Sequence, residues 1–145
     1  MTRLVLIIED SDEDFYGIQR VVERRAADVE ISRSSSGDEA IETLLHMEGA
    51  SGSMLPDVIL LDLNLPGFDG RSVLRQIRAR RALNRIPIVI FSTSSSQVDI
   101  TDCYRNGASA YCVKPVGFVE FERTVSLISE FWFETVRFSD RGSFG

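Results

Sequence analysis

The sequence predicts an α/β fold in which one five-stranded parallel sheet carries helices on both faces, the doubly wound arrangement. Two observations lead to this prediction. Five segments of strand length recur along the chain, most of them apolar runs and one alternating in polarity, and the segments that follow them place apolar residues at helical spacing. Strands that alternate with helices in this way are typical of parallel sheets with crossover helices. The length of 145 residues suits one domain with a single core.

The first strand and the first helix have clear signals. Residues 4–8 form an apolar run with the length of a buried strand, and Glu9 and Asp10 end it. Ser11 is a typical N-cap with Asp14 three residues on, so a helix is predicted to start there. The expected core positions of this helix are Phe15, Ile18, Val22 and Ala26.

The next elements have weaker signals. Residues 29–33 alternate in polarity and predict a second strand, and residues 35–38 predict a turn and helix cap. The second helix is marked by Ala40, Ile41, Leu44, Leu45 and Met47. Its lone His46 is expected to be a surface or half-buried structural residue. The small residues at 49–56 are interpreted as a connector, not as a domain boundary.

The middle of the chain holds the strongest strand signal. Residues 58–61 are all apolar, and Asp62 stands where this run ends, before several turn-forming residues. A third helix is predicted to start near Asp69, with Val73, Leu74 and Ile77, and less clearly Arg81, on its inner face. A fourth strand is predicted at residues 88–91, and it ends in the serines of residues 92–96.

The last third of the chain completes the alternation. A helix over about 98–105 is expected to end at Asn106 and Gly107, and a fifth strand over 109–113 ends at Lys114. The last helix is predicted to run from about 118 to 136. Its predicted core-facing residues are Phe118, Phe121, Val125, Ile128 and Trp132.

Three large residues near the end of the chain fall largely outside this core-facing stripe. They are Leu127, Phe131 and Phe138. The core could curl around them, but a second copy of the chain is the favoured explanation, because a helix with a second apolar face needs a cover. We therefore expect a homodimer through the last helix, in a single domain over 1–145 whose helix extends to about 137 and ends in a short tail.

Composition excludes several classes of function. The net charge of −6 argues against a nucleic-acid-binding surface, which needs a clustered positive field. Cys103 and Cys112 lack Cys-x-x-Cys spacing, so neither a zinc site nor a disulfide framework is indicated. No signal peptide and no apolar span of about 20 residues stands in the sequence, so no membrane partner and a cytoplasmic location are expected.

Polar side chains stand directly after four of the five predicted strands. Because parallel strands bring their carboxyl ends to one edge of the sheet, these side chains should meet there. They are Glu9, Asp10, Asp62, Ser92 and Lys114. Close carboxylates repel, and a divalent cation such as Mg²⁺ relieves the repulsion. Asp10, Asp62 and the Asn64 backbone carbonyl are the expected ligands, with the longer Glu9 acting through water.

The same arrangement suits phosphoryl transfer to a carboxylate. Asp62 can attack as a nucleophile and form an acyl phosphate. Lys114, the only lysine of the chain, and a metal can neutralise charge on the transferred group, and the Ser92 hydroxyl can donate to it. Each residue alone could be a turn cap, a loop serine or a surface cation. Their joint position at successive strand ends favours the functional interpretation.

Four motifs resemble the receiver domain of two-component response regulators, in the right order and over about residues 3–131. They are Ile8-Glu9-Asp10-Ser11, the stretch Leu61 to Gly70, Phe91-Ser92-Thr93 and Tyr111-Cys112-Val113-Lys114-Pro115. The resemblance implies the flavodoxin-like sheet order 2-1-3-4-5 and Asp62 as phosphoacceptor. It also implies an acidic pair at Glu9 and Asp10, a switch hydroxyl at Ser92, a phosphoryl-contacting Lys114 and a switch aromatic at Tyr111. The Glu-Asp pair and the serine at 92 replace the commoner Asp-Asp and Thr.

The resemblance also implies the partners. A receiver accepts phosphate from a sensor histidine kinase, and residues 130–136 resemble the extended end of single-domain regulators that partner phytochrome-type kinases. A single-domain regulator is expected, because few residues follow the last helix. Such a protein is a switch and not an enzyme. The alternative, an aspartyl-phosphate hydrolase of the haloacid-dehalogenase type, needs a general acid where Asn64 stands. A nucleotide-binding protein would need a glycine-rich phosphate loop, which the sequence lacks.

Overall fold

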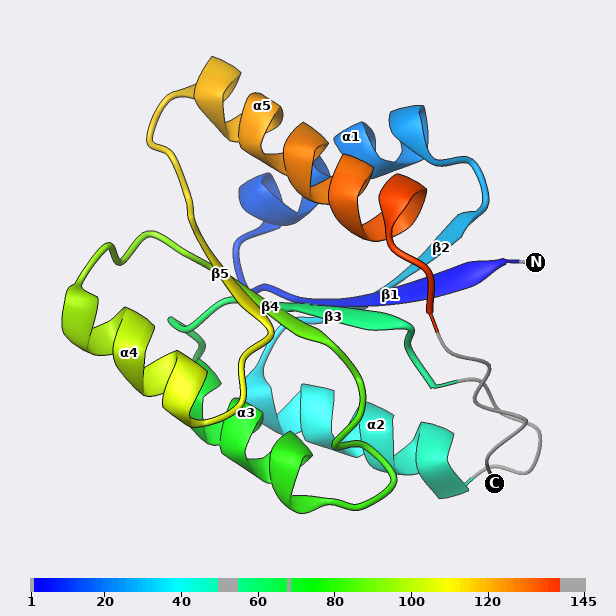
Figure 1. Cartoon of the computed structure of the whole chain (residues 1–145), viewed down its shortest axis with the longest axis vertical. Helices are drawn as coiled ribbons and strands as arrows, with labels where there is room; N and C mark the ends of the chain where they lie inside the picture. Colours follow the sequence, from blue (N-terminus) through cyan, green and yellow to red (C-terminus); the bar gives the residue numbers. More distant parts are fainter. Residues whose placement is uncertain (1, 50–54, 68, 139–145) are drawn as a thin grey trace.

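The computed structural model describes residues 2–49, 55–67 and 69–138, and it has the predicted parallel sheet in the order β2-β1-β3-β4-β5. The strands are β1 Arg3–Ile8, β2 Val29–Ser34, β3 Val58–Leu61, β4 Ile88–Ser92 and β5 Ala110–Val113. The helices are α1 Asp12–Arg25, α2 Gly37–Gly49, α3 Gly70–Ala79, α4 Gln97–Arg105 and α5 Phe118–Ser129. The doubly wound α/β fold is therefore confirmed (Figure 1).

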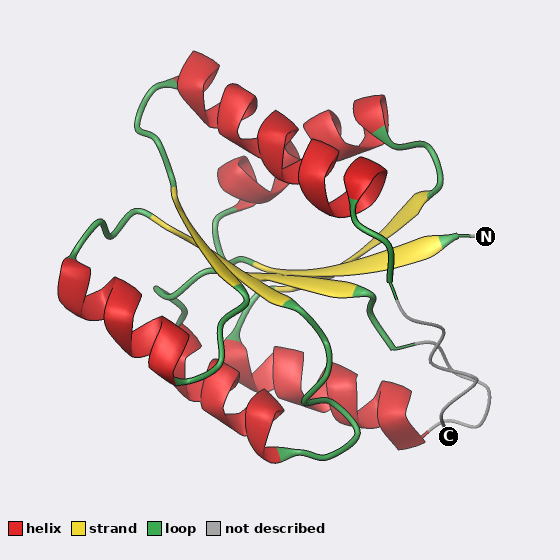
Figure 2. Cartoon of the chain, in the orientation of Figure 1, coloured by secondary structure: helices red, strands yellow, loops and turns green. Residues whose placement is uncertain are grey.

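The helices form two layers around the sheet. Helices α1 and α5 cover one face, and α2, α3 and α4 cover the other (Figures 1 and 2). Nearly every side chain of β1, and every one of β3 and β4, is buried, as expected for central strands of a parallel sheet packed on both faces. The core is accordingly split into two apolar clusters, one under each helical layer.

Local capping signals in the sequence are matched by hydrogen bonds. Ser11 Oγ accepts from Asp14 N at 3.2 Å at the start of α1, and Asp69 caps α3. Ser96 does the same for α4, which ends at Asn106 with Gly107 at a φ of 99°. That positive φ favours glycine, so the predicted stop signal is confirmed.

The end of the last helix differs from the prediction. The α-helix stops at Ser129 and continues as a π-helical turn, η1, over Glu130–Thr135. In this turn Val136 N donates to Phe131 O at 2.9 Å, a five-residue step. The wider turn rotates the following residues, so Phe133 and not Trp132 takes the fully buried position after Ile128.

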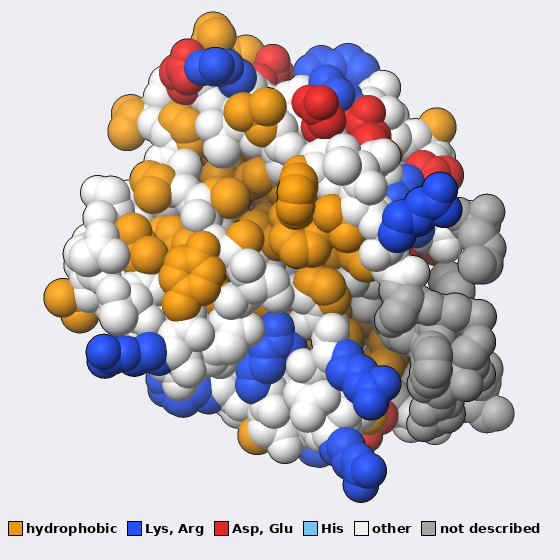
Figure 3. Space-filling view, in the orientation of Figure 1, with side chains coloured by type: hydrophobic (Ala, Val, Ile, Leu, Met, Phe, Trp, Pro, Cys, Tyr) orange, Lys and Arg blue, Asp and Glu red, His pale blue; other side chains and the backbone are white. Residues whose placement is uncertain are grey.

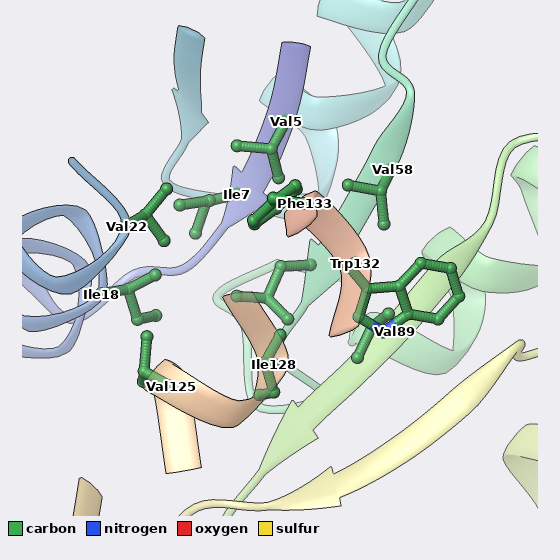
Figure 4. Close-up of a pocket in the computed structure, with 11 residues that line it drawn as sticks. Val5, Ile7, Ile18, Val22, Val58, Val89, Val125, Ile128, Trp132 and Phe133 are labelled. Carbon is green, nitrogen blue, oxygen red and sulfur yellow. The ribbon is translucent and has the colours of Figure 1, made fainter. Parts of the chain in front are cut away.

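Two residues that were predicted to face the core from the last helix are not fully buried. Figure 4 shows Phe133 between Val5 and Val58, while Trp132 lies beside Val89 and stays half-buried. The prediction that Phe118 faces the core is wrong, because its side chain is 65% exposed at the first position of α5.

The space between η1, α1 and the sheet is core and not a ligand site. The cavity there measures about 10 Å³ and has only apolar lining residues (Figure 4). A void of this size barely holds one water molecule and offers it no polar partner.

The face formed by α4, β5 and α5 carries exposed apolar side chains. Figure 3 shows hydrophobic groups gathered across the middle of this face. Leu127 and Phe131 are 56% and 52% exposed, so the prediction that they leave the core stripe is confirmed. Phe138 differs, because it is half-buried against the core cluster under α1 and α5.

Some predictions lie outside the described residues. They are most of the connector over 49–56, Phe68 of the second motif and the tail after 138. Within the described ranges, no helix is both long enough and apolar enough to cross a membrane.

Candidate functional site

Three carboxylates meet where β1 and β3 end. Oxygen atoms of Glu9, Asp10 and Asp62 lie within 4.8 Å of one another. The parallel register causes this, because Asp62 N donates to Ile8 O at 3.0 Å and so continues the β1–β3 ladder past the strands. Glu9 and Asp62 are buried and Asp10 is exposed, so the predicted cluster has an inner wall and an open side.

Lys114 lies at the centre of this acidic site. It follows β5, and its N donates to Ser92 O at 2.7 Å, which places it next to the end of β4. Its Nζ donates to Glu9 at 2.5 Å and to Asp62 at 3.2 Å, and the side chain is almost completely buried. The predicted meeting of the only lysine with Asp62 is thus present in the structure.

Asp14 is a fourth carboxylate that sequence reasoning missed. It contacts Lys114 Nζ at 3.0 Å from the first turn of α1, one hundred residues away in the chain. The sequence marked Asp14 only as part of a helix start. Its approach to Lys114 depends on how α1 packs over the sheet, which no local pattern reveals.

The site holds more carboxylates than positive charges, because Lys114 alone contacts Glu9, Asp14 and Asp62. Burial raises the pKa of Glu9 to about 8, against the opposing effect of the Lys114 ammonium, and the Asp62 charge adds to the rise. Burial alone would lower the pKa of Lys114, but its bond to Glu9 and the charges of Glu9 and Asp62 outweigh burial and raise it. One ammonium therefore serves several carboxylates, which fits a site that a divalent cation completes.

The donor chemistry fits a hard divalent cation. Carboxylate oxygens from three side chains, open to water on the Asp10 side, are the ligands that Mg²⁺ and Mn²⁺ take. Asn64 N donates to Asp62 Oδ1 at 3.3 Å, so the chain folds back around the phosphoacceptor candidate. The role of the Asn64 backbone carbonyl as a ligand stays a prediction.

The predicted switch residues are linked through Ser94. Ser92 is fully buried, and its Oγ accepts from Ser94 N at 3.2 Å. Tyr111 Oη donates to Ser94 O at 2.7 Å from the neighbouring strand. A movement of the Ser92 hydroxyl toward Asp62 would therefore break a bond to the residue that holds Tyr111.

The Ser94 loop is also tied to two helices, which the sequence did not suggest. Ser94 Oγ donates to Asp99 of α4 at 2.6 Å, and Arg71 of α3 pairs with the same carboxylate. The Ser94 hydrogen bond and the Arg71 charge hold the pKa of Asp99 below its usual range. Helices α3 and α4 thus meet at the loop that carries the switch hydroxyl.

Gly70 fixes the backbone around the phosphoacceptor. Its N donates to Leu63 O at 2.8 Å, and a Cβ at this position would stand 2.3 Å from Asp62 O. Only a residue without a side chain allows α3 to start this close to the end of β3. The glycine was visible in the sequence as a turn former, but its contact with Asp62 was not.

The sequence of this chain is similar to a known protein family and to several known proteins. Residues 5–126 match the model of the response regulator receiver domain. The probable methanogenesis regulatory protein FilR2 of Methanothrix harundinacea is 37% identical over 129 residues, covering 89% of this chain and 83% of that protein. The response regulator Rcp1 of Synechocystis is 34% identical over 134 residues, covering 92% and 91%.

Solved structures agree with the sequence matches. The phosphorylated cyanobacterial phytochrome response regulator RcpA superposes with a TM-score of 0.89 at 32% identity, covering 97% of this chain and all of that one. The Mn²⁺-bound form of Rcp1 gives a TM-score of 0.86 at 34% identity, covering 95% and 99%. A metal-bound relative with this similarity agrees with the donor chemistry of the acidic cluster.

Proposed function

The chain belongs to the response regulator receiver domain family of two-component systems and is related to phytochrome response regulators, and on this premise we propose that it accepts a phosphoryl group from a sensor histidine kinase on Asp62. The observation that carries the proposal is the position of the Asp62 carboxylate. One of its oxygens lies within 4.8 Å of oxygens of Glu9 and Asp10, and it accepts a hydrogen bond from Lys114 Nζ at 3.2 Å.

The chemistry at Asp62 follows from its surroundings. A carboxylate oxygen of Asp62 forms a bond to phosphorus while the bond from phosphorus to the donor nitrogen breaks. Lys114 already contacts this carboxylate and can turn its ammonium toward the oxygens of the transferred group. A divalent cation, which we propose to be Mg²⁺, would be held by Glu9, Asp10 and Asp62 and would neutralise the remaining charge there.

The signal is proposed to leave the site through Ser92. When the Ser92 side chain turns so that its hydroxyl donates to the phosphoryl group, Oγ moves away from Ser94 N, so the Ser94 loop and the Tyr111 side chain bound to it can shift. A switch requires such an element with two arrangements that the phosphoryl group biases. The output is then a change in protein contacts on the α4, β5 and α5 face.

The similarity to RcpA supports a phytochrome-type kinase as the partner. We also propose that the chain is not a turnover enzyme, beyond taking phosphate from small donors and hydrolysing its own acyl phosphate. A hydrolase of the haloacid-dehalogenase type would need a proton donor at the place of Asn64, whose amide cannot serve.

A small phosphodonor tests this function directly. Incubation with acetyl phosphate or phosphoramidate and Mg²⁺ should add one phosphoryl group per chain, detected by mass spectrometry and lost in mild alkali as acyl phosphates are. Chelation of the metal should suppress the adduct. Sustained, multiple-turnover hydrolysis of the donor without a stoichiometric adduct would show the hydrolase alternative instead.

The metal proposal makes a separate prediction. Asp10→Ala should weaken Mg²⁺ binding to the unphosphorylated protein by about tenfold or more, since loss of outer partners alone costs metal sites ~10–100-fold. Calorimetric titration measures this change. Asp38→Ala is a matched control, because Asp38 is an exposed acid of α2 outside the cluster. Equal affinities in the Asp10→Ala and unmodified proteins would place the metal elsewhere.

We further propose a homodimer built on the face of α4, β5 and α5, with Phe131 near its centre. Leu127, Phe131 and Phe118 are each more than half exposed there, and Phe131 stacks edge-on against Trp132 at 5.2 Å. Large exposed aromatic groups of this kind are typical of interface centres. A twofold contact on this face would lie beside Tyr111 and so could respond to phosphorylation.

Phe131→Asp should give monomers that still accept phosphate, because it buries a charge in the proposed contact and leaves Asp62 untouched. Light scattering at tens of micromolar measures the state. Tyr16→Asp is the control, since Tyr16 of α1 is 54% exposed and lies outside this face. The dimer proposal fails if the unmodified protein is monomeric with and without phosphate.

A further inference from the structure

Arg33 of β2 lies directly behind the loop that carries the two acidic residues after β1. Its Nε and Nη2 donate to Glu9 O at 3.2 and 3.1 Å, and Nη2 also reaches Asp10 O at 3.4 Å. Its Nη1 pairs with Asp12 Oδ1 at 2.8 Å. One guanidinium therefore holds three groups of this segment: the carbonyls of Glu9 and Asp10 and the carboxylate of Asp12, the first residue of α1.

The rest of the side chain is fixed as well. The guanidinium carbon lies 4.6 Å above the ring centroid of Phe15, and the side chain is 19% exposed. Glu9 N donates to Ser34 O at 3.0 Å, so the residue after Arg33 holds the same turn through the backbone. Holding a long arginine side chain in one geometry costs conformational entropy. The contacts of Arg33 with the turn after β1 must therefore offset this cost, and they fix the turn in return.

The turn that Arg33 holds decides where two of the three carboxylates point. The Glu9 carboxylate accepts from Ser11 N at 3.2 Å and so moves with the backbone of the turn. Asp10 is exposed, and its direction depends on the backbone that carries it. A shift of this backbone would therefore move the carboxylates of Glu9 and Asp10 away from Asp62.

We infer that Arg33 is a positioning residue of the divalent-cation site, which fixes the Glu9–Asp10 turn so that its carboxylates converge with Asp62. This inference rests on the metal site of the proposed function. Arg33 touches neither the cation nor the phosphoryl group. It acts through the main chain, as outer partners of metal ligands do.

The charge of Arg33 and its hydrogen bonds have opposite effects on the affinity of the site for a cation. A guanidinium close to the acidic cluster repels a cation, so removing the charge alone should tighten metal binding. Removing the planar guanidinium should weaken metal binding. A lysine at this position would keep the charge, but it cannot donate to two carbonyls and a carboxylate in one fixed geometry. Substitutions that separate charge from geometry therefore test the inference.

The decisive variant is Arg33→Lys, which keeps the charge and loses the planar guanidinium. Titration calorimetry with Mn²⁺ and with Mg²⁺ on the unphosphorylated protein should show binding about tenfold weaker or more. In phosphodonor labelling, the Mg²⁺ concentration for half-maximal rate should rise by a similar factor, while the rate at saturating Mg²⁺ changes less than about twofold. A purely structural role would lower the melting temperature and leave the half-saturating concentration unchanged.

Arg3→Lys is the matched control. Arg3 is also a partly buried arginine on a strand, and its guanidinium donates to both carboxylate oxygens of Asp28. It lies at the opposite end of the strands from the acidic cluster. Its replacement should leave the cation affinity unchanged. Arg33→Met is the second variant, because its apolar chain can still cover the Phe15 ring. We expect weaker cation binding in Arg33→Met as well, because the lost positioning of the turn should outweigh the lost repulsion, and tighter binding would overturn the inference.

The outcomes separate this inference from the function beneath it. Unchanged cation affinity in Arg33→Lys, in a protein whose unmodified form binds the cation and accepts phosphate, overturns only the role of Arg33. If the unmodified protein binds neither cation, the metal site itself is wrong, and the role of Arg33 is overturned with it. Weaker binding in both Arg33 variants and unchanged binding in Arg3→Lys support the inference.

Discussion

Asp62→Asn should reduce phosphoryl labelling to background, with the protein still folded. The amide oxygen is a much poorer nucleophile than the carboxylate, so no acyl phosphate forms, and it is also a poorer cation ligand. Lys114 keeps its contacts with Glu9 and Asp14 in this variant. Because one of several close carboxylates is removed, the repulsion in the buried cluster falls and folding should not suffer.

Mass spectrometry after incubation with a small phosphodonor and Mg²⁺ measures the effect. Asp38→Asn makes the same chemical change at an exposed acid of α2 and should label like the unmodified protein. Circular dichroism confirms that both variants are folded. Undiminished labelling of Asp62→Asn, with the same lability to alkali, would remove Asp62 as the phosphoacceptor.

Gly70→Ala should strongly disrupt the start of α3. Its Cβ would stand 2.3 Å from Asp62 O and 2.7 Å from Leu63 Cα, and both are backbone atoms that cannot rotate away. Forcing a methyl group into a packed contact typically costs about 1–3 kcal/mol, and here we expect the upper end of that range. The start of α3 must move away from β3.

The same change should impair the reaction. Displacing the Asp62 backbone by even a fraction of an ångström misaligns its carboxylate, and a shift of about 1 Å can cost on the order of 100-fold in rate. Denaturant unfolding and the initial rate of phosphodonor labelling measure the two effects. Gly49→Ala is the control, because a Cβ there has no neighbour within 4 Å. Equal stability and rate in both alanine variants would contradict the proposed contact.

Much of the fold could be predicted because its signals are local. Apolar or alternating segments predicted the five strands within a residue or two, and Ser11, Asp69 and Asn106 marked helix ends through caps that depend only on neighbouring residues. The cluster of Glu9, Asp62 and Lys114 could also be predicted. Parallel strands share one carboxyl edge whatever the details of packing, so the order of strands and polar residues was enough.

Other features depend on segments far apart in the chain. Asp14 reaches Lys114, and Arg33 reaches the turn after β1, only because helix α1 and strand β2 dock beside those residues. The link from Arg71 through Asp99 to Ser94 likewise needs α3 and α4 side by side. A salt bridge between distant residues has no local pattern, since any exposed acid and base could form it.

The sequence by itself therefore determined the strands, the helix caps and the edge of the sheet where the chemistry lies, because hydrophobic spacing and capping act within a few residues. Only the tertiary structure decided the course of the last helix. The predicted stripe assumed 3.6 residues per turn, but one π turn brought Phe133 into the gap between Val5 and Val58 and left Trp132 half-buried. The shape of a cavity between a sheet and two helices selects which aromatic ring fills it, and that shape exists only once the chain has folded.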